Sequence, residues 1–241
     1  MILISIHVTI NELLHTRDRN ESYTDDECRK MSDGLGDFLI QKVKNIKSKI
    51  ADQLPSRTSS SVSDFGRSAN GRTFDDLVSV SADDVKKIIS SMPSKSSPVD
   101  VLPASLLKVC TDVFAPVIAH LANLSFQEGS FPDAFKTAQV LPLLKKPGLD
   151  RECFSNFRPI SNLSTISKIL ERLVLARLGP FLKSSPNYNA MQSAYREAHS
   201  TETALLKIFD DVLSNIEAKQ LTVLVALDIS AAFDTISHSK L

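Results

Sequence analysis

The feature that most constrains the fold is an apolar run close to the C-terminal end of the sequence. Residues 221–227 read LTVLVAL, and the next residue is Asp228. A short and nearly continuous apolar run is typical of a strand buried in a sheet. A carboxylate that is buried without a cation, a hydrogen-bond donor or water would destabilise the fold. The run therefore predicts a buried strand, with Asp228 at its end placed to meet one of these partners.

The rest of the sequence predicts helices around a few strands. Ser81, with Asp84 three residues later, forms a capping box that starts one helix, and Ser164 can cap another. A short apolar strand ending in a basic Pro-Gly turn is expected within 137–148. Helices packed around a few strands indicate an α/β or α+β body. Helices are expected over 33–54, from Ser81, from Pro103 to about Gln127 with a new start near Pro116, after Ser164, and from about Thr201 to Ala218.

Two of these helices carry a continuous apolar face at helical spacing, which predicts that each face is buried. In the helix after Ser164 the face consists of Ile166, Ile169, Leu170, Leu173, Val174, Leu178 and Phe181. In the helix from Thr201 the inward residues are Ala204, Leu205, Ile208, Phe209, Val212, Leu213 and Ile216.

The sequence also suggests how the chain is divided. Residues 55–72 are rich in Ser, Gly and Arg and poor in apolar residues, which predicts a flexible linker. We therefore expect an N-terminal helical segment over 1–54, a linker over 55–73 and a main domain over 74–241. The apolar ten residues at the N-terminus are too short to span a bilayer, so no membrane partner is expected.

The total charge of the sequence and the local charge of one region lead to different predictions about nucleic-acid binding. Lys plus Arg and Asp plus Glu both total 28, so the overall charge predicts no nucleic-acid partner. Between 135 and 186, however, nine basic residues face three acidic ones, a net charge of +6. If these side chains share a surface, that surface could grip phosphates. The basic residues are Lys136, Lys145, Lys146, Arg151, Arg158, Lys168, Arg172, Arg177 and Lys183.

Several kinds of site place an aspartate after an apolar strand. A P-loop ATPase and a dinucleotide-binding fold both need a glycine-rich turn that this sequence does not contain. A phosphatase with an aspartyl nucleophile usually has a second Asp two residues on, where this chain has Ser230. A nucleotidyl transferase that uses two metal ions fits. The residues alone favour this kind of site no more than a simpler alternative, in which Asp228 caps the turn that follows it.

Four segments together resemble one family. LDISAAFD (227–234) resembles the first catalytic motif of reverse transcriptases, especially those of LINE-type, jockey-like non-LTR retrotransposons. In the expected order, 140–178 resembles their fingers motif, 189–205 the next motif, and 96–108 the segment before the fingers. The resemblance covers roughly 74–241. It implies the helix-rich fingers and partial palm of a right-hand polymerase. Because the sequence stops soon after the first catalytic motif, we expect it to be truncated there.

The resemblance implies an RNA-directed DNA polymerase that adds nucleotides to a primer 3′-hydroxyl. Asp228 would be the catalytic residue and a ligand of two Mg²⁺ ions, with the backbone carbonyl of Ile229 helping to hold one of them. Phe233 would crowd a ribose 2′-hydroxyl and so favour deoxynucleotides; filling the core is its alternative role. The 33–54 helix looks like the one that often lies between endonuclease and polymerase in these proteins.

Further residues would bind the substrates. Arg158 and Lys145 or Lys146 would grip the triphosphate, because a guanidinium binds phosphate with two donors and an ammonium acts as a point charge. Gln192 and Arg196 would contact the template strand, or else stabilise their own turn. The implied partners are an RNA template, a DNA primer and dNTPs, with no expectation about oligomeric state. The implied location is a ribonucleoprotein of cytoplasm and nucleus.

The family also uses a second carboxylate pair, C-terminal to the first motif, which this sequence does not include. We therefore expect the 241 residues alone to be inactive in DNA synthesis. The alternative function is non-catalytic, a retrotransposon-derived remnant that binds RNA or a protein partner. An unrelated helical interaction module would require four motif matches by coincidence.

Overall fold

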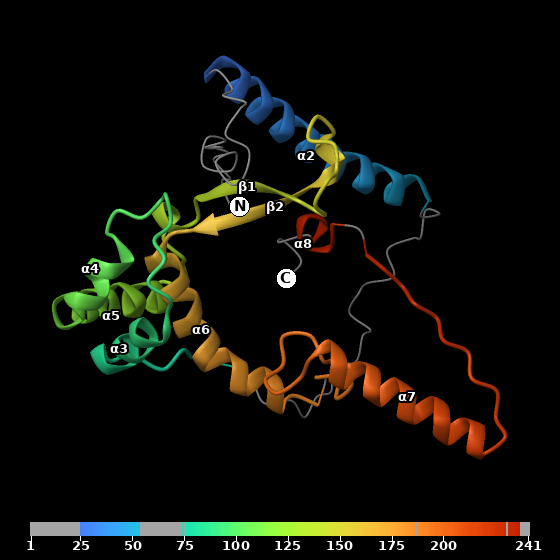
Figure 1. Ribbon diagram of the computed structural model, residues 1–241. Helices are drawn as coiled ribbons and strands as arrows, with labels where there is room; N and C mark the ends of the chain where they lie inside the picture. The colour runs from blue at the N-terminus through green and yellow to red at the C-terminus, as the bar shows by residue number, and fades with distance from the viewer. Residues whose placement is uncertain (1–24, 54–73, 75, 187, 230, 237–241) are drawn as a thin grey trace.

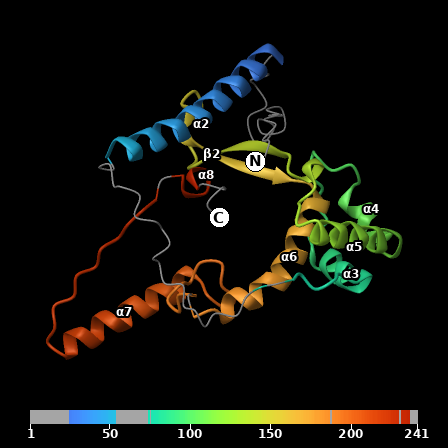
Figure 2. The same ribbon diagram turned by 180° about the vertical axis from the view of Figure 1, so that it is seen from behind.

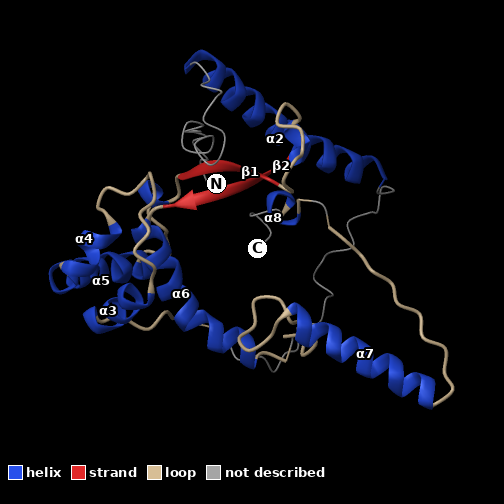
Figure 3. Ribbon diagram, in the orientation of Figure 1, coloured by secondary structure: helices blue, strands red, loops and turns tan. Residues whose placement is uncertain are grey.

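The computed structural model describes residues 25–53, 74, 76–186, 188–229 and 231–236, and it combines helices with one small antiparallel sheet (Figures 1 and 3). The mixed helix-and-strand class expected from the sequence is confirmed. In chain order the elements are α2 (Asp25–Gln53), α3 (Ala82–Ser91), α4 (Ala104–Val109), α5 (Thr111–Gln127), η2 (Asp133–Phe135), β1 (Ala138–Leu144), η3 (Phe154–Asn156), β2 (Phe157–Leu163), α6 (Thr165–Ser184), α7 (Thr201–Glu217) and α8 (Ala232–Thr235).

The helix starts follow their local capping signals. The Asp84 amide donates to Ser81 Oγ over 3.2 Å, and the Ser81 amide donates to the Asp84 carboxylate over 3.1 Å, so the predicted capping box forms. Ser164 Oγ likewise accepts from the Ser167 amide at the start of α6. Two boundaries differ from expectation: α2 begins at Asp25 rather than at 33, and the break expected near Pro116 lies at Cys110.

The capping box should make α3 sensitive to acid. The Ser81 backbone and side-chain hydrogen bonds, followed by Arg177, lower the pKa of Asp84. A lowered folded-state pKa contributes stability above the unfolded pKa, and that stability is lost as pH falls through the folded value. We expect Ser81→Ala to lower the free energy of unfolding by about 1 kcal/mol at pH 7, as measured by urea titration. Its dependence on acid pH should flatten only in part, because the backbone amide at position 81 still donates to Asp84.

Ser90→Ala is the matched control for this substitution. Ser90 lies in the last turn of α3, is exposed and donates only to the Lys87 carbonyl. Its replacement should change stability by less than about 0.5 kcal/mol. Equal losses in the two variants would show that the capping box contributes nothing specific to the stability of α3.

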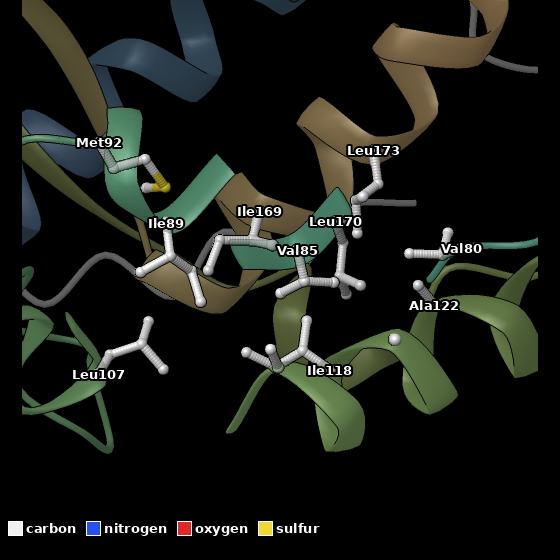
Figure 4. Close-up of a cluster of buried hydrophobic side chains, with 12 residues drawn as sticks. Val80, Val85, Ile89, Met92, Leu107, Ile118, Ala122, Ile169, Leu170 and Leu173 are labelled. Carbon is white, nitrogen blue, oxygen red and sulfur yellow. The ribbon is translucent and has the colours of Figure 1, made fainter. Parts of the chain in front are cut away.

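The hydrophobic core lies where α3, α5 and α6 meet (Figure 4). The N-terminal half of the α6 face predicted from spacing is buried here, which confirms that part of the prediction. Phe181, at the other end of the face, packs against Phe74 with ring centroids 5.1 Å apart. The core consists of Val80, Val85, Ile89, Met92, Leu107, Ala115, Ile118, Ala119, Ala122, Ile169, Leu170 and Leu173.

Arg177 fastens α6 to the segment before α3. Its Nε donates to the Val78 carbonyl over 2.5 Å and its Nη2 to the Ser79 carbonyl over 3.0 Å. The same guanidinium lies 3.3 Å from the Asp84 carboxylate and above the Phe126 ring. Its side chain is only 13% exposed. The prediction that Arg177 belongs to a phosphate-gripping surface is therefore wrong, because its donors are used within the protein.

The sheet is a hairpin of β1 and β2, and β2 was not expected as a strand. Pro142 lies opposite Pro159 in the antiparallel register. The Lys145 amide donates to the Asn156 carbonyl, which makes that pair hydrogen-bonded. Pairs alternate along an antiparallel ladder, so the Pro142–Pro159 pair, three positions away, is non-hydrogen-bonded. The prolines are tolerated there because neither needs to donate across the ladder.

Two predictions of burial are wrong. Residues 221–229 form no strand and are exposed throughout, with Leu227 89% exposed. The apolar face of α7 is not buried either, and Phe209 is 62% exposed. Figure 2 shows α7 and the extended stretch after it lying apart from the α3–α6 core. A strand needs neighbours for its amides and carbonyls, and an apolar face needs a partner; the described residues supply neither here.

The predicted linker over 55–73 lies outside the described residues, as do residues 1–24. Within the part of the chain that is described, no helix combines the length and the apolar character needed to cross a bilayer.

Candidate nucleotide and metal site

Lys145 and Arg158 lie on the same face of the hairpin. Arg158 stands opposite Leu143, and Lys145 follows Leu143 by two residues with its amide still bonded across the ladder. Because side chains alternate between faces along a strand, Leu143, Lys145 and Arg158 project from one face. Both cations are exposed, so this face presents an ammonium and a guanidinium to water. The arrangement is suited to binding an extended anion such as a polyphosphate.

The turn between β1 and β2 holds Lys145 in place. Lys145 Nζ donates to the Ser155 carbonyl over 2.7 Å, and the Asn156 side chain donates to the Asp150 carbonyl over 2.9 Å. Gly148 has φ +79°, a left-handed conformation that glycine adopts without strain. The predicted basic Pro-Gly turn is therefore present. Lys146 is exposed in the same turn.

The remaining basic residues of 135–186 do not form one uniform surface. Lys136 pairs with Asp133 over 2.7 Å, and Lys168 donates to the Asn162 side chain over 3.2 Å. Arg177 is engaged as described above. The net charge of +6 counted along the sequence is therefore partly used for internal contacts. The exposed cations of the hairpin besides Lys145 are Lys146, Arg151 and Arg158.

Asp228 and Phe233 lie on either side of Ala231, the residue that precedes α8. Asp228 and Ile229 end the exposed stretch, and α8 begins after Ala231, whose φ is +51°. The Asp234 amide and the Thr235 hydroxyl both donate to the Ala231 carbonyl over 3.0 Å, which holds the start of α8. Phe233 is 72% exposed, so it does not fill the core. Asp228 is open to water, and its carboxylate has not been forced by burial to find a partner.

Gln192 and Arg196 make contacts within their own loop. Gln192 Nε2 donates to the Ala194 carbonyl over 3.3 Å, and Arg196 Nη1 donates to the Ala190 carbonyl over 2.7 Å. The Arg196 guanidinium also lies over the Tyr188 ring, 6.0 Å from its centroid. Both side chains thus stabilise the loop, which is the alternative role considered from the sequence.

The part of the chain from Lys145 to Phe233 lies within the match to one family model. Residues 144–241 match the model described as reverse transcriptase (RNA-dependent DNA polymerase). Over these residues the chain belongs to the reverse transcriptase family. Lys145, at the start of the match, and Phe233, near its end, both fall inside it.

Individual relatives extend the similarity upstream. The chain is 30% identical over 166 residues to the RNA-directed DNA polymerase from mobile element jockey of Drosophila melanogaster, covering 68% of this chain and 18% of that protein. It is 29% identical over 163 residues to a probable RNA-directed DNA polymerase from transposon BS of the same species, covering 67% and 18%. To the Pol polyprotein from retrotransposable element R2 of Popillia japonica it is 32% identical over 122 residues, covering 51% and 16%. The chain thus spans about a fifth of the length of these relatives.

Reverse transcriptases generally use divalent metal ions, and the oxygen atoms present here are of the type that binds such ions. Asp228 offers a carboxylate and Ile229 a backbone carbonyl, and hard divalent cations prefer oxygen ligands. Among the described residues, no three His, Cys, Asp or Glu side chains come together in a group that could hold a metal. Asp228 and Ile229 would together supply two oxygen ligands to such an ion.

Sequence reasoning missed one contact of this region. The ring of Phe154, in η3, packs against Phe38 of α2 with ring centroids 6.1 Å apart. The only local signal was the glycine-containing segment DGLGDF at 33–38, which helical periodicity treats as ordinary helix surface.

Proposed function

We propose that this chain forms part of an RNA-directed DNA polymerase of a non-LTR retrotransposon, which extends a DNA primer on an RNA template with dNTPs. The observation that carries the proposal is the shared hairpin face of Lys145 and Arg158, inside the residues that match the reverse transcriptase family. The names of the similar proteins support the polymerase function and do not favour the non-catalytic alternative.

The basic hairpin binds the triphosphate of the incoming nucleotide. Arg158 donates two parallel hydrogen bonds to phosphate oxygens, and Lys145 and Lys146 add point charges. Lys145 is already oriented by its bond to the Ser155 carbonyl, so little side-chain entropy is lost when the anion binds.

Asp228 and the Ile229 carbonyl hold divalent metal at the reacting end of the nucleotide, and we propose two Mg²⁺ ions as in other two-metal transferases. When bound, such ions lower the pKa of the primer 3′-hydroxyl and neutralise charge on the transferred phosphate and the leaving pyrophosphate. Phe233, on α8, lies against the sugar and excludes a 2′-hydroxyl by its bulk.

Gln192 and Arg196 present their loop to the template strand while the bonds within the loop keep its shape. We further propose that the chain is organised as a helical segment over 1–54, a linker over 55–73 and a polymerase portion over 74–241. The enzyme acts in a ribonucleoprotein with the RNA that it copies.

Whether the basic hairpin is a phosphate-binding surface can be tested through the salt dependence of nucleic-acid binding. We expect the 241-residue chain to bind an RNA/DNA duplex with an affinity that falls steeply as salt increases. Changing Lys145, Lys146 and Arg158 to Ala should reduce the slope of log K against log[salt] by about 0.9 for each phosphate that these side chains neutralise in the wild type. Fluorescence anisotropy with a labelled duplex over a salt series measures the slope.

A variant of equal charge provides the control. Lys44, Lys47 and Lys49 are exposed on α2, and changing all three to Ala removes the same charge from another part of the molecule. Its slope should stay close to that of the wild type. If the hairpin variant keeps the wild-type slope, or the slope of the α2 variant falls as much, the hairpin is not the phosphate-binding surface.

A further inference from the structure

The helix α2 lies outside the residues that match the family, yet it makes a close contact with the basic hairpin. Gly34, in the interior of α2, lies directly beneath the Phe154 ring. A Cβ at this position would lie 2.9 Å from Phe154 Cζ and 3.0 Å from Cε2. The neighbouring Leu35 is only 4% exposed. Glycine allows this approach without moving the Phe154 ring, although it costs a helix about 1 kcal/mol relative to alanine.

The same contact reaches Lys145 through one short segment. Phe154 begins η3, and the next two residues supply the carbonyl oxygens that hold Lys145. The Ser155 carbonyl accepts from Lys145 Nζ over 2.7 Å, and the Asn156 carbonyl accepts from the Lys145 amide over 2.9 Å. When α2 fixes Phe154, it therefore fixes the two acceptors that orient this ammonium.

A second contact connects α2 to the other part of the site. α8, which carries Phe233, packs against α2 (Figure 1). The basic turn and α8 are far apart in the sequence. α2 therefore contacts both η3, through the Phe38–Phe154 pair, and α8.

We infer that α2 is a positioning element that holds the basic turn and α8 in a fixed relation. This inference rests on the proposed function, which places the triphosphate on the turn and the sugar against Phe233. The grip on the nucleotide and the exclusion of ribonucleotides then depend on Gly34 and Phe154, two positioning residues that touch no substrate.

Hydrogen exchange in the 241-residue chain tests the structural part of the inference. Gly34→Val puts a branched side chain where the Phe154 ring rests. We expect amide exchange to rise about tenfold in both 150–156 and 232–236, while the α3, α5 and α6 peptides stay protected. Gly179→Val is the matched control, because a Cβ at Gly179 meets only Leu175 Cδ1 at 3.8 Å; it should leave both segments unchanged. Faster exchange in 150–156 alone, or across the whole chain, would overturn the inference.

A double variant distinguishes loss of the contact with Phe154 from a general destabilisation of the fold. In Gly34→Val/Phe154→Ala the new side chain occupies the space left by the ring. Protection of 232–236 should then recover toward the wild-type level, since α2 can return to its place. Failure of this rescue would show that Gly34→Val acts through α2 itself and not through the contact with Phe154.

Binding of inorganic tripolyphosphate, measured by calorimetry, tests the functional part. We expect Gly34→Val to weaken binding about fivefold or more, while Gly179→Val binds as the wild type does. Equal binding by Gly34→Val and the wild type would overturn the positioning role. If the wild type itself does not bind tripolyphosphate, the proposed triphosphate grip fails, and the exchange experiment still shows whether α2 holds both segments.

Discussion

Replacing Asp228 by asparagine should abolish DNA synthesis in a polymerase that joins this chain to the family's second carboxylate pair. Asparagine keeps the shape of the side chain but removes the charge that binds divalent cations. Loss of several kcal/mol of transition-state stabilisation corresponds to a decrease in kcat/KM of about 10³-fold or more. Because Asp228 is exposed, the free energy of unfolding should change by less than about 0.5 kcal/mol. Primer extension on poly(rA)/oligo(dT) with Mg²⁺ measures the activity.

Asp234→Asn is the control for charge. Asp234 is exposed on α8, six positions after Asp228, and the proposed site gives it no metal to bind. This variant should retain most of the activity. Near-normal synthesis by Asp228→Asn would mean that Asp228 only stabilises the turn after it, and the proposed role of this residue would have to be withdrawn.

Phe233→Val should leave DNA synthesis largely intact and admit ribonucleotides. Only bulk next to the sugar 2′ position is removed, so the ratio of kcat/KM for dNTP over rNTP should fall by about 10- to 200-fold. Phe233 is exposed, so the substitution creates no cavity in the core. Single-nucleotide incorporation with each class of substrate measures the ratio.

Phe209→Val makes the same change on the exposed face of α7. It should leave discrimination between the two nucleotide classes unchanged. If Phe233→Val lowers incorporation of both classes equally, Phe233 supports the site without selecting the sugar. If neither class is affected, its ring does not lie near the nucleotide.

Local signals in the sequence were sufficient for the starts of α3 and α6. Ser81 and Ser164 mark two helix starts because their hydroxyls bond to amides only three residues away, so no distant part of the chain is needed. The basic Pro-Gly turn is equally local, since Gly148 supplies the left-handed conformation by itself. The family motifs could also be found from the sequence, because they are short segments in a fixed order.

The contacts between distant segments could not be predicted in this way. In the sequence Arg177 is one of several basic residues with no visible partner. In the structure its guanidinium donates to the carbonyls of Val78 and Ser79, about a hundred residues earlier. β2 was not predicted as a strand, and only its register with β1 shows how the chain tolerates two prolines, which lie opposite each other at a non-hydrogen-bonded pair.

The apolar run at 221–227 shows most clearly the difference between what the sequence determines and what the tertiary structure decides. By itself the sequence determined where α3 and α6 start, which faces are apolar and which motifs the chain carries. Only the tertiary structure decided which faces are covered: the α6 face meets α3 and α5, whereas the α7 face and the run before Asp228 meet no partner among the described residues. The physical reason is that apolarity describes one surface, while burial requires a second surface that the fold must bring to it.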